Sequence, residues 1–69
     1  MTAAQCRAAR ALLQITQDQL ATKSGVSQKA IANFELGKTV PMRANLVVLQ
    51  QALELLGVEF LERDGVRRK

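Results

Sequence analysis

The sequence predicts an all-α domain of four short helices, followed by a short C-terminal strand or hairpin at about residues 58–68. Two observations support this fold class. Apolar residues recur at helical spacing in four segments, at about residues 3–13, 17–24, 28–36 and 45–56. Hydrophobic residues make up 48% of the chain but only two are aromatic, so the core must be built from Leu, Val, Ile and Ala, as in packed helices.

The first helix has a well-specified start. Thr2 and Gln5 have the spacing of a capping box, and the residues that follow are rich in helix formers. Its inward face would carry Cys6, Ala9, Arg10 and Leu13. An inward arginine needs a partner, because burying it unpaired costs several kcal/mol.

The second and third helices are joined by a tight turn at Gly25. Thr16 and Gln19 repeat the capping-box spacing at the start of the second helix, and Ser27 is placed to cap the third. Gly25 lies where a left-handed backbone is free only for a residue without a Cβ atom. The pattern is that of a helix-turn-helix.

The third helix has one apolar face and one polar face. Ala30, Ile31 and Phe34 lie on one side, and Gln28, Lys29, Ala32 and Asn33 lie on the other. The apolar side is expected to pack, which leaves the polar side free. Its amides and its cation suit the edges of base pairs in a major groove.

Over roughly residues 3–57 the sequence resembles the Cro and phage-repressor family of helix-turn-helix proteins. The positions that carry the resemblance are Arg10, Thr16-Gln17, Leu20-Ala21, Gly25-Val26-Ser27, Ile31, Phe34-Glu35 and Gly37-Lys38. Gln14-Ile15 departs from the Gly-hydrophobic pair that is common in the family at the end of the first helix. The resemblance implies a lambda-repressor-like bundle with a recognition helix in the major groove of double-stranded DNA.

The resemblance also implies which residues contact DNA. Gln28, Lys29 and Asn33 would reach base edges, and Ser27 would reach a base or a phosphate beside its capping role. Gln17, at the start of the second helix, would orient on a phosphate. The other phosphate candidates are Lys38, Thr39 and Arg43. For each of these residues the alternative is a solvated surface position.

Family members often pair an arginine of the first helix with a glutamate at the end of the recognition helix. In this sequence the matching residues are Arg10 and Glu35, and we expect them to form a structural ion pair. The alternative is that both are solvated.

The fourth helix is expected at about residues 45–56, with Asn45 as its N-cap and Gly57 at its end. It follows a loop that includes Arg43 and Pro41, which cannot lie inside a helix. Leucines recur along one face, and Val47, Val48, Leu55 and Leu56 extend the apolar surface beyond it. This apolar surface is wider than packing against one neighbour within the chain requires.

The C-terminal segment from Val58 reads as a short strand or hairpin, with Asp64-Gly65 suited to a type I′ turn. It resembles a subgroup of small bacterial regulators in which a Gly-Val-Glu-Phe strand follows the last helix. Residues 67–69 are basic, and we expect a frayed, solvated end, with a phosphate contact as the alternative.

The chain is expected to form a single domain, residues 1–69, and to act as a two-fold homodimer. A chain of this size buries only about 60% of its unfolded surface, so a second subunit would add stability. The expected interface consists of Leu55, Leu56, Val58 and Phe60. The alternative is a monomer in which a hairpin pairs the strand within its own chain, so that two chains associate only on DNA.

Composition excludes several classes of function. There is no histidine, and no set of nucleophile, base and orienting group can be assembled, so we expect no enzyme, no metal and no cofactor. The single cysteine is expected to be a buried thiol. No apolar run approaches the length of about 20 residues that spans a membrane, and no signal peptide is visible, so we expect a cytoplasmic protein.

The net charge is +4, with five basic and two acidic residues in residues 1–40, against five and four in residues 41–69. Excess positive charge therefore lies in the helix-turn-helix half, a bias expected of a nucleic-acid binder but also common among small domains that bind none. We expect a sequence-specific transcriptional regulator, a repressor acting on a palindromic site. The alternatives are an antitoxin-like regulator that also binds a partner protein, and a helix-turn-helix used as a protein-interaction module.

Overall fold

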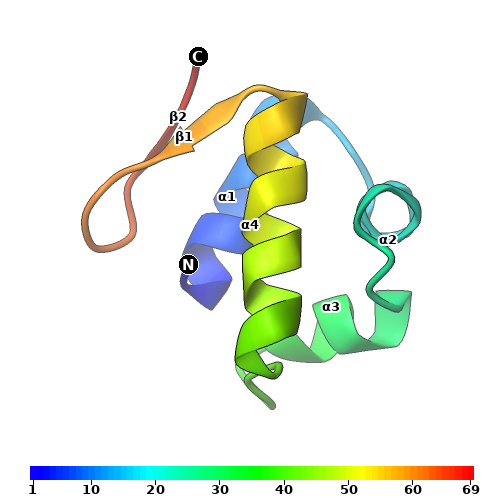
Figure 1. Ribbon diagram of the computed structural model, residues 1–69. Helices are drawn as coiled ribbons and strands as arrows, with labels where there is room; N and C mark the ends of the chain where they lie inside the picture. The colour runs from blue at the N-terminus through cyan, green and yellow to red at the C-terminus, as the bar shows by residue number, and fades with distance from the viewer.

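A computed structural model describes residues 1–69 as four helices followed by a two-stranded antiparallel hairpin (Figure 1). The predicted fold class is therefore confirmed. The elements are α1 (Ala3–Leu13), α2 (Gln17–Ser24), α3 (Gln28–Glu35), α4 (Arg43–Leu56), β1 (Val58–Phe60) and β2 (Val66–Arg68). No helix combines the length and the apolar character that crossing a membrane requires.

The first three helices begin where their capping residues predict. Both capping boxes are formed. The side chains of Thr2 and Thr16 each accept a hydrogen bond from the backbone N–H of the glutamine three residues later, and the side chain of that glutamine accepts one from the backbone N–H of the threonine. The Ser27 side chain accepts from the N–H of Ala30. Gly25 ends α2 with φ +79°, in the left-handed region expected of it. Local sequence therefore determines these boundaries.

The predicted start of α4 is wrong. The helix begins at Arg43 with Met42 as its N-cap, so Asn45 lies in the first turn and caps nothing. The carbonyl of Met42 accepts from the N–H groups of Asn45 and Leu46, at 2.9 and 3.1 Å, so the chain becomes helical immediately after Pro41-Met42. This end of the helix is exposed, and water can satisfy its free N–H groups without a side-chain cap.

Two details of the helix boundaries also differ from the sequence-based expectation. Arg43 belongs to α4 and not to the preceding loop. Leu36 is the C-cap of α3 and not its last helical residue.

In Figure 1 α4 runs through the middle of the view, in front of α1, and residues of α4 take part in the hydrophobic core. Every helix contributes to it, and so does β1. Its nine buried hydrophobic residues are Cys6, Ala9, Leu20, Val26, Ile31, Phe34, Leu49, Leu53 and Val58. Val58, expected at a dimer interface, is fully buried within its own chain, and Phe60 packs against the same core. The hairpin is therefore part of the fold of one chain.

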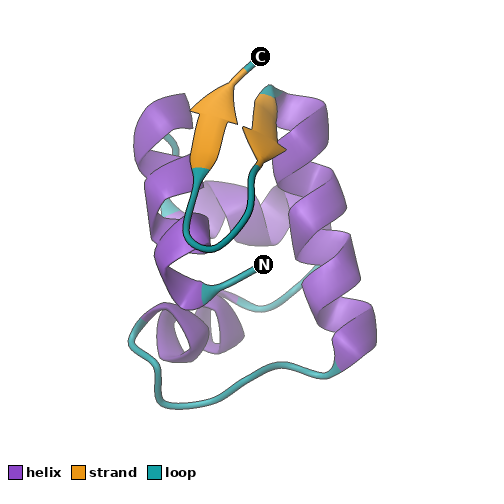
Figure 2. Ribbon diagram, turned by 90° about the vertical axis from the view of Figure 1, so that its left-hand side faces the viewer, coloured by secondary structure: helices purple, strands orange, loops and turns teal.

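The hairpin runs alongside α1 and also packs against α4 (Figure 2). Its register pairs Val58 with Arg68 and Phe60 with Val66. The predicted type I′ turn at Asp64-Gly65 is wrong, because Gly65 donates its N–H to the Glu62 carbonyl at 3.1 Å, which places Arg63 and Asp64 at the centre. Arg63 has the positive φ, +60°.

Contacts with the start of α1 explain this turn. The Gln5 amide donates to the carbonyls of Leu61 and Gly65 at 2.9 and 2.8 Å, and the Thr2 hydroxyl donates to Asp64 at 2.8 Å. The backbone at Gly65 lies close to Leu61, and a Cβ atom on residue 65 would be only 2.9 Å from the Leu61 Cβ. This position therefore requires glycine. Docking on α1 thus overrides the local preference of the Asp-Gly pair.

The basic C-terminal residues are exposed, as expected, but they are not frayed, because Arg67 and Arg68 belong to β2. Arg67 pairs with Glu59 at 2.6 Å across the hairpin. Arg68 and Lys69 donate to backbone carbonyls in the last turns of α1 and α4, where the helix dipole favours positive charge. The C-terminus and α3 lie at opposite ends of the molecule in Figure 1. These cations therefore do not belong to the face that α3 presents.

The backbone conformation of Gln14, the residue after α1, predicts how a substitution there changes the free energy of unfolding. Gln14 is exposed and left-handed, with φ +56° and ψ +43°, a conformation that costs a residue with a Cβ atom about 1–2 kcal/mol. We expect Gln14→Gly to stabilise the protein by roughly 0.5–1 kcal/mol, since the greater unfolded-state freedom of glycine offsets part of the gain. Thermal unfolding measures the change.

The matched control is Gln14→Ala, which removes the same side chain and keeps the Cβ atom. It should show no gain. Equal melting temperatures for the glycine and alanine variants would mean that the backbone at this position stores no strain.

Candidate nucleic-acid interface

The turn at Gly25 sets α2 and α3 at a large angle to each other. In Figure 1 α2 is seen almost end-on, while α3 lies across the view below it. Ile31 and Phe34 of α3 are buried, which fixes the rotation of this helix about its axis. One side of α3 is therefore turned outward in a defined orientation.

The outward side of α3 is polar, as the sequence pattern predicts. Ser27, Gln28 and Lys29 are exposed at its start, and Asn33 is partly exposed one turn further on. The carbonyl of Asn33 accepts from the N–H of Lys38 at 2.9 Å, which holds the following loop against the end of the helix. The structure thus gathers the four predicted base-contact residues on one helix and one side.

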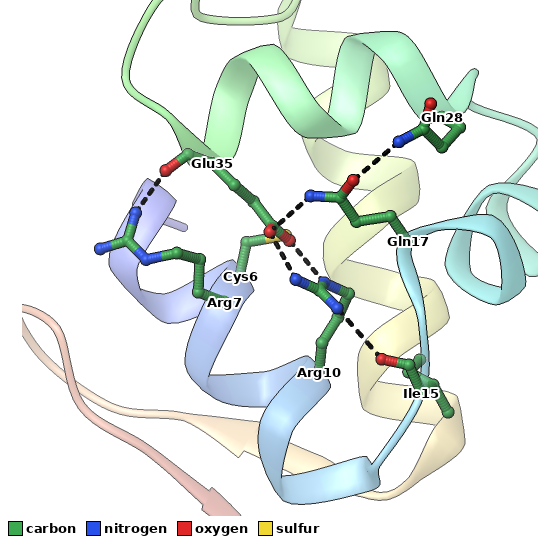
Figure 3. Close-up of polar contacts among 7 residues, drawn as sticks. All are labelled: Cys6, Arg7, Arg10, Ile15, Gln17, Gln28 and Glu35. Carbon is green, nitrogen blue, oxygen red and sulfur yellow. Dashed lines mark hydrogen bonds and ion pairs between the residues drawn. The ribbon is translucent and has the colours of Figure 1, made fainter.

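A buried carboxylate lies behind this surface. Glu35 is 3% exposed and accepts two hydrogen bonds of 2.7 Å from the guanidinium of Arg10, through Nε and Nη2 (Figure 3). Arg10 also donates to the carbonyl of Ile15 at 3.1 Å, and Arg7 donates to the backbone carbonyl of Glu35. The last residue of α3 is in this way tied to α1 and to the segment before α2.

Burial alone raises the pKa of the Glu35 carboxyl, but the hydrogen bonds that it accepts, above all from Arg10, outweigh that effect. The pKa therefore lies below its ordinary value and the group is ionised at neutral pH. The pKa of Arg10 is raised by its hydrogen bond to Glu35, against the opposing effect of partial burial. Each partner stabilises the charged form of the other.

Cys6 is fully buried and donates its thiol hydrogen to Glu35 Oε2 at 3.2 Å. Burial, followed by the hydrogen bond and the negative charge of Glu35, raises the pKa of the thiol to about 12. A neutral, enclosed thiol is a poor nucleophile and a poor metal ligand. No three His, Cys, Asp or Glu side chains are grouped so that they could hold a metal ion.

The first residues of α2 and α3 are linked to this carboxylate. Gln17 donates its amide N–H to Glu35 Oε1 at 3.0 Å, and Gln28 donates to Gln17 Oε1 at 2.8 Å (Figure 3). We call Glu35, Gln17 and Gln28 the amide relay. Sequence reasoning assigned Gln17 to a phosphate and missed the relay, because no spacing within the chain shows that the starts of α2 and α3 lie side by side.

The sequence model of the helix-turn-helix family matches residues 7–62. The chain belongs to the helix-turn-helix family. The resemblance to Cro and phage-repressor regulators is confirmed, and the protein has the DNA-binding, transcription-regulator type of function that goes with this family. No curated protein matches the chain closely enough to count as a relative.

The other predicted phosphate contacts of this helix-turn-helix protein follow α3 in the chain. Lys38 and Thr39 are exposed in the loop after α3, and Arg43 is exposed at the first position of α4. Neither Lys38 nor Arg43 forms an ion pair with an acidic residue. Their charges are free to act on a ligand outside the chain.

The Arg10–Glu35 pair predicts a stability that depends on pH. The folded-state pKa of Glu35 is lowered, so its contribution is complete above the unfolded value of about 4.3 and is lost as the pH falls through the folded value. At neutral pH we expect Arg10→Met or Glu35→Leu alone to cost roughly 3–5 kcal/mol, and the double variant to cost less than either. Urea unfolding of the four proteins measures the coupling.

The same cycle in acid should show no coupling, because a protonated carboxyl does not pair with the guanidinium. Glu62→Gln removes a carboxylate of the hairpin loop that is in no ion pair, and it should leave the coupling unchanged. Additive effects at neutral pH would show that the two residues do not stabilise the fold as a pair.

Proposed function

We propose that this protein binds a specific sequence of double-stranded DNA and acts as a small transcriptional repressor, with α3 in the major groove. The observation that carries the proposal is the outward polar face of α3, formed by Gln28, Lys29 and Asn33. The same helix buries Ile31 and Phe34, so this face is presented by a rigid element. A recognition helix needs both properties.

The side chains of this face match the chemistry of base edges. Gln28 and Asn33 can each pair bidentately with adenine, and Lys29 can donate to guanine. The Ser27 oxygen accepts from Ala30 at 3.2 Å as a helix cap, which leaves the hydroxyl hydrogen free to donate to a base or a phosphate. These contacts would supply sequence discrimination.

Lys38, Thr39 and Arg43 would contact phosphates on either side of the groove. They supply no discrimination among bases, but they fix the register of α3 and make affinity depend on salt. The side chain of Gln17 is occupied by the amide relay. We therefore assign the phosphate role at the start of α2 to its free backbone N–H groups.

We further propose a two-fold dimer on a palindromic site, because one helix-turn-helix reads only a few base pairs, and a dimer places two recognition helices about 34 Å apart. The support is the outer face of α4, where Val47, Val48 and Leu55 remain exposed at helical spacing. Leu55 is 89% exposed, the largest fraction among the large hydrophobic residues. Since Val58 is buried in its own chain, this face and not the strand side chains would form the contact.

The antitoxin-like alternative rests on a separate observation. Leu36, Val40 and Met42 are largely exposed between α3 and α4, a surface on which a partner protein could bind. A pure protein-interaction module fits less well, because its recognition face should be apolar or acidic. Binding to DNA and binding to such a partner are compatible.

Sequence-specific binding predicts a selectable DNA site. The protein should enrich one motif from a random duplex pool, and Gln28→Ala and Asn33→Ala should each lose about 1–3 kcal/mol of discrimination at one position. Lys38→Ala is the matched control, since loss of a phosphate contact should weaken all sites alike. Recovery of the same motif with the same affinity by all variants would rule out base reading by α3.

The dimer predicts a mass of two chains in sedimentation at micromolar concentration. Leu55→Asp should reduce it to one chain, because a carboxylate would be buried at the centre of the contact. Leu36→Asp is the matched control and should remain a dimer, because Leu36 is also a largely exposed leucine, at 70%, but does not belong to α4. A wild-type protein that sediments as one chain throughout would end the hypothesis of a dimer in the absence of DNA.

A further inference from the structure

The outer face of α4 has a regular pattern along the length of the helix. Its exposed residues Ala44, Val48, Gln51 and Leu55 are spaced by four, three and four residues, as are the contact positions of a coiled coil. We call these four residues the α4 stripe. None of them is charged, and in Figure 2, where α4 forms the right-hand side of the molecule, no segment lies beyond that helix. The α4 stripe is therefore suited to pack against another helix.

A second copy of this chain fits the α4 stripe, because the stripe carries both a protruding residue and a hollow. Leu55 is 89% exposed. Beside it lies a hollow lined by Gln51, Glu54, Lys69 and Leu55 itself. In coiled coils each contact residue enters such a hole on the facing helix. A two-fold axis uses the same patch on both subunits, so each Leu55 would enter the hollow of the other copy.

The position of α3 decides how the two copies must be oriented. In Figure 1 α3 lies at the end of the molecule where α4 begins, and the hairpin lies at the other end. Two recognition helices read a palindrome only when both face the same duplex. A two-fold axis parallel to α4 keeps both at one end of the dimer, whereas an antiparallel pair of α4 helices would place them at opposite ends. Binding to a palindrome therefore requires a parallel pair.

Gln51 is the one polar residue of the α4 stripe. In a parallel pair that is in register, each residue of the stripe faces the same residue of the partner subunit, so Gln51 meets its own copy. An amide carries both a donor and an acceptor, so two amides related by a two-fold axis can bond to each other. In a pair shifted by one turn, Gln51 would face Val48 or Leu55 and lose this partner. A single polar residue at such a position specifies register in coiled coils.

We propose that two copies of α4 pack in parallel and in register along the α4 stripe, with Gln51 hydrogen-bonded to Gln51 of the partner subunit. This inference rests on the proposed dimer, and it adds the orientation of the two chains and the residue that fixes it. The dimer then presents both recognition helices to one side before it meets DNA.

Single cysteines test the orientation in the absence of DNA. Val48→Cys, Gln51→Cys and Leu55→Cys should each give a disulfide-linked dimer under mild oxidation. In a parallel pair each of these residues lies beside its own copy, within the Cα separation of about 7 Å that a disulfide can span. The native Cys6 is fully buried and should not react. The linked fraction is measured on a non-reducing gel.

Ala11→Cys, at an exposed position of α1, is the matched control and should stay unlinked. In an antiparallel pair Val48 and Leu55 cannot both lie beside their own copies, because at least one of them would be about 10 Å away along the helix axis. Failure of linkage at any of the three stripe positions would therefore overturn the proposal.

The pairing of Gln51 is tested by adding charge. Gln51→Glu keeps the size of the side chain but places two carboxylates against each other, so the dissociation constant of the dimer should rise at least about tenfold at neutral pH. Gln14→Glu makes the same change at an exposed glutamine that follows α1, and it should leave the constant unchanged. Sedimentation over a range of concentrations measures both. A constant for Gln51→Glu no higher than that of the wild type would overturn the proposal.

Failure of this inference can be told apart from failure of the proposed function, because the cysteine experiment contains no DNA. A protein that selects a palindromic motif but does not link at all three positions keeps the proposed function and refutes the parallel α4 pair. A protein that links at all three positions and selects no motif supports the pair and refutes sequence-specific binding.

Discussion

The buried carboxylate of Glu35 joins three helices at one point. Its oxygens accept from Arg10 and Cys6 of α1 and from Gln17 of α2, while its own backbone ends α3. Burying this charge without its donors would cost several kcal/mol, so the carboxylate can lie between the helices only when its partners are in place. The orientation of α3 relative to α1 and α2 is a consequence.

Stability and recognition share this set of contacts. The core of nine hydrophobic residues holds the inner side of α3, and the Glu35 contacts hold its end. From the same carboxylate the amide relay continues to Gln28 on the outer surface. The hydrogen bonds of the buried carboxylate are in this way continuous with the outer surface of α3.

The C-terminal hairpin has a different role. Val58 completes the core between α1 and α4, and Gln5 holds the turn through two carbonyls. Arg68 and Lys69 bond to the last turns of two helices at the end of the molecule away from α3. In a chain this short, the hairpin covers apolar helix surface that would otherwise require a further helix or a second subunit.

Local sequence alone was sufficient to predict the helix-turn-helix, because capping boxes, the left-handed glycine and helical periodicity act over three to five residues. It also placed Gln28, Lys29 and Asn33 on one face. A long-range contact decided the hairpin turn, which Gln5 moved from Asp64-Gly65 to Arg63-Asp64. The exposed start of α4 needed no side-chain cap, so the capping preference of Asn45 did not determine it. Gln17 faces Gln28 only because packing brings two helix starts together, and no spacing within the chain encodes that distance.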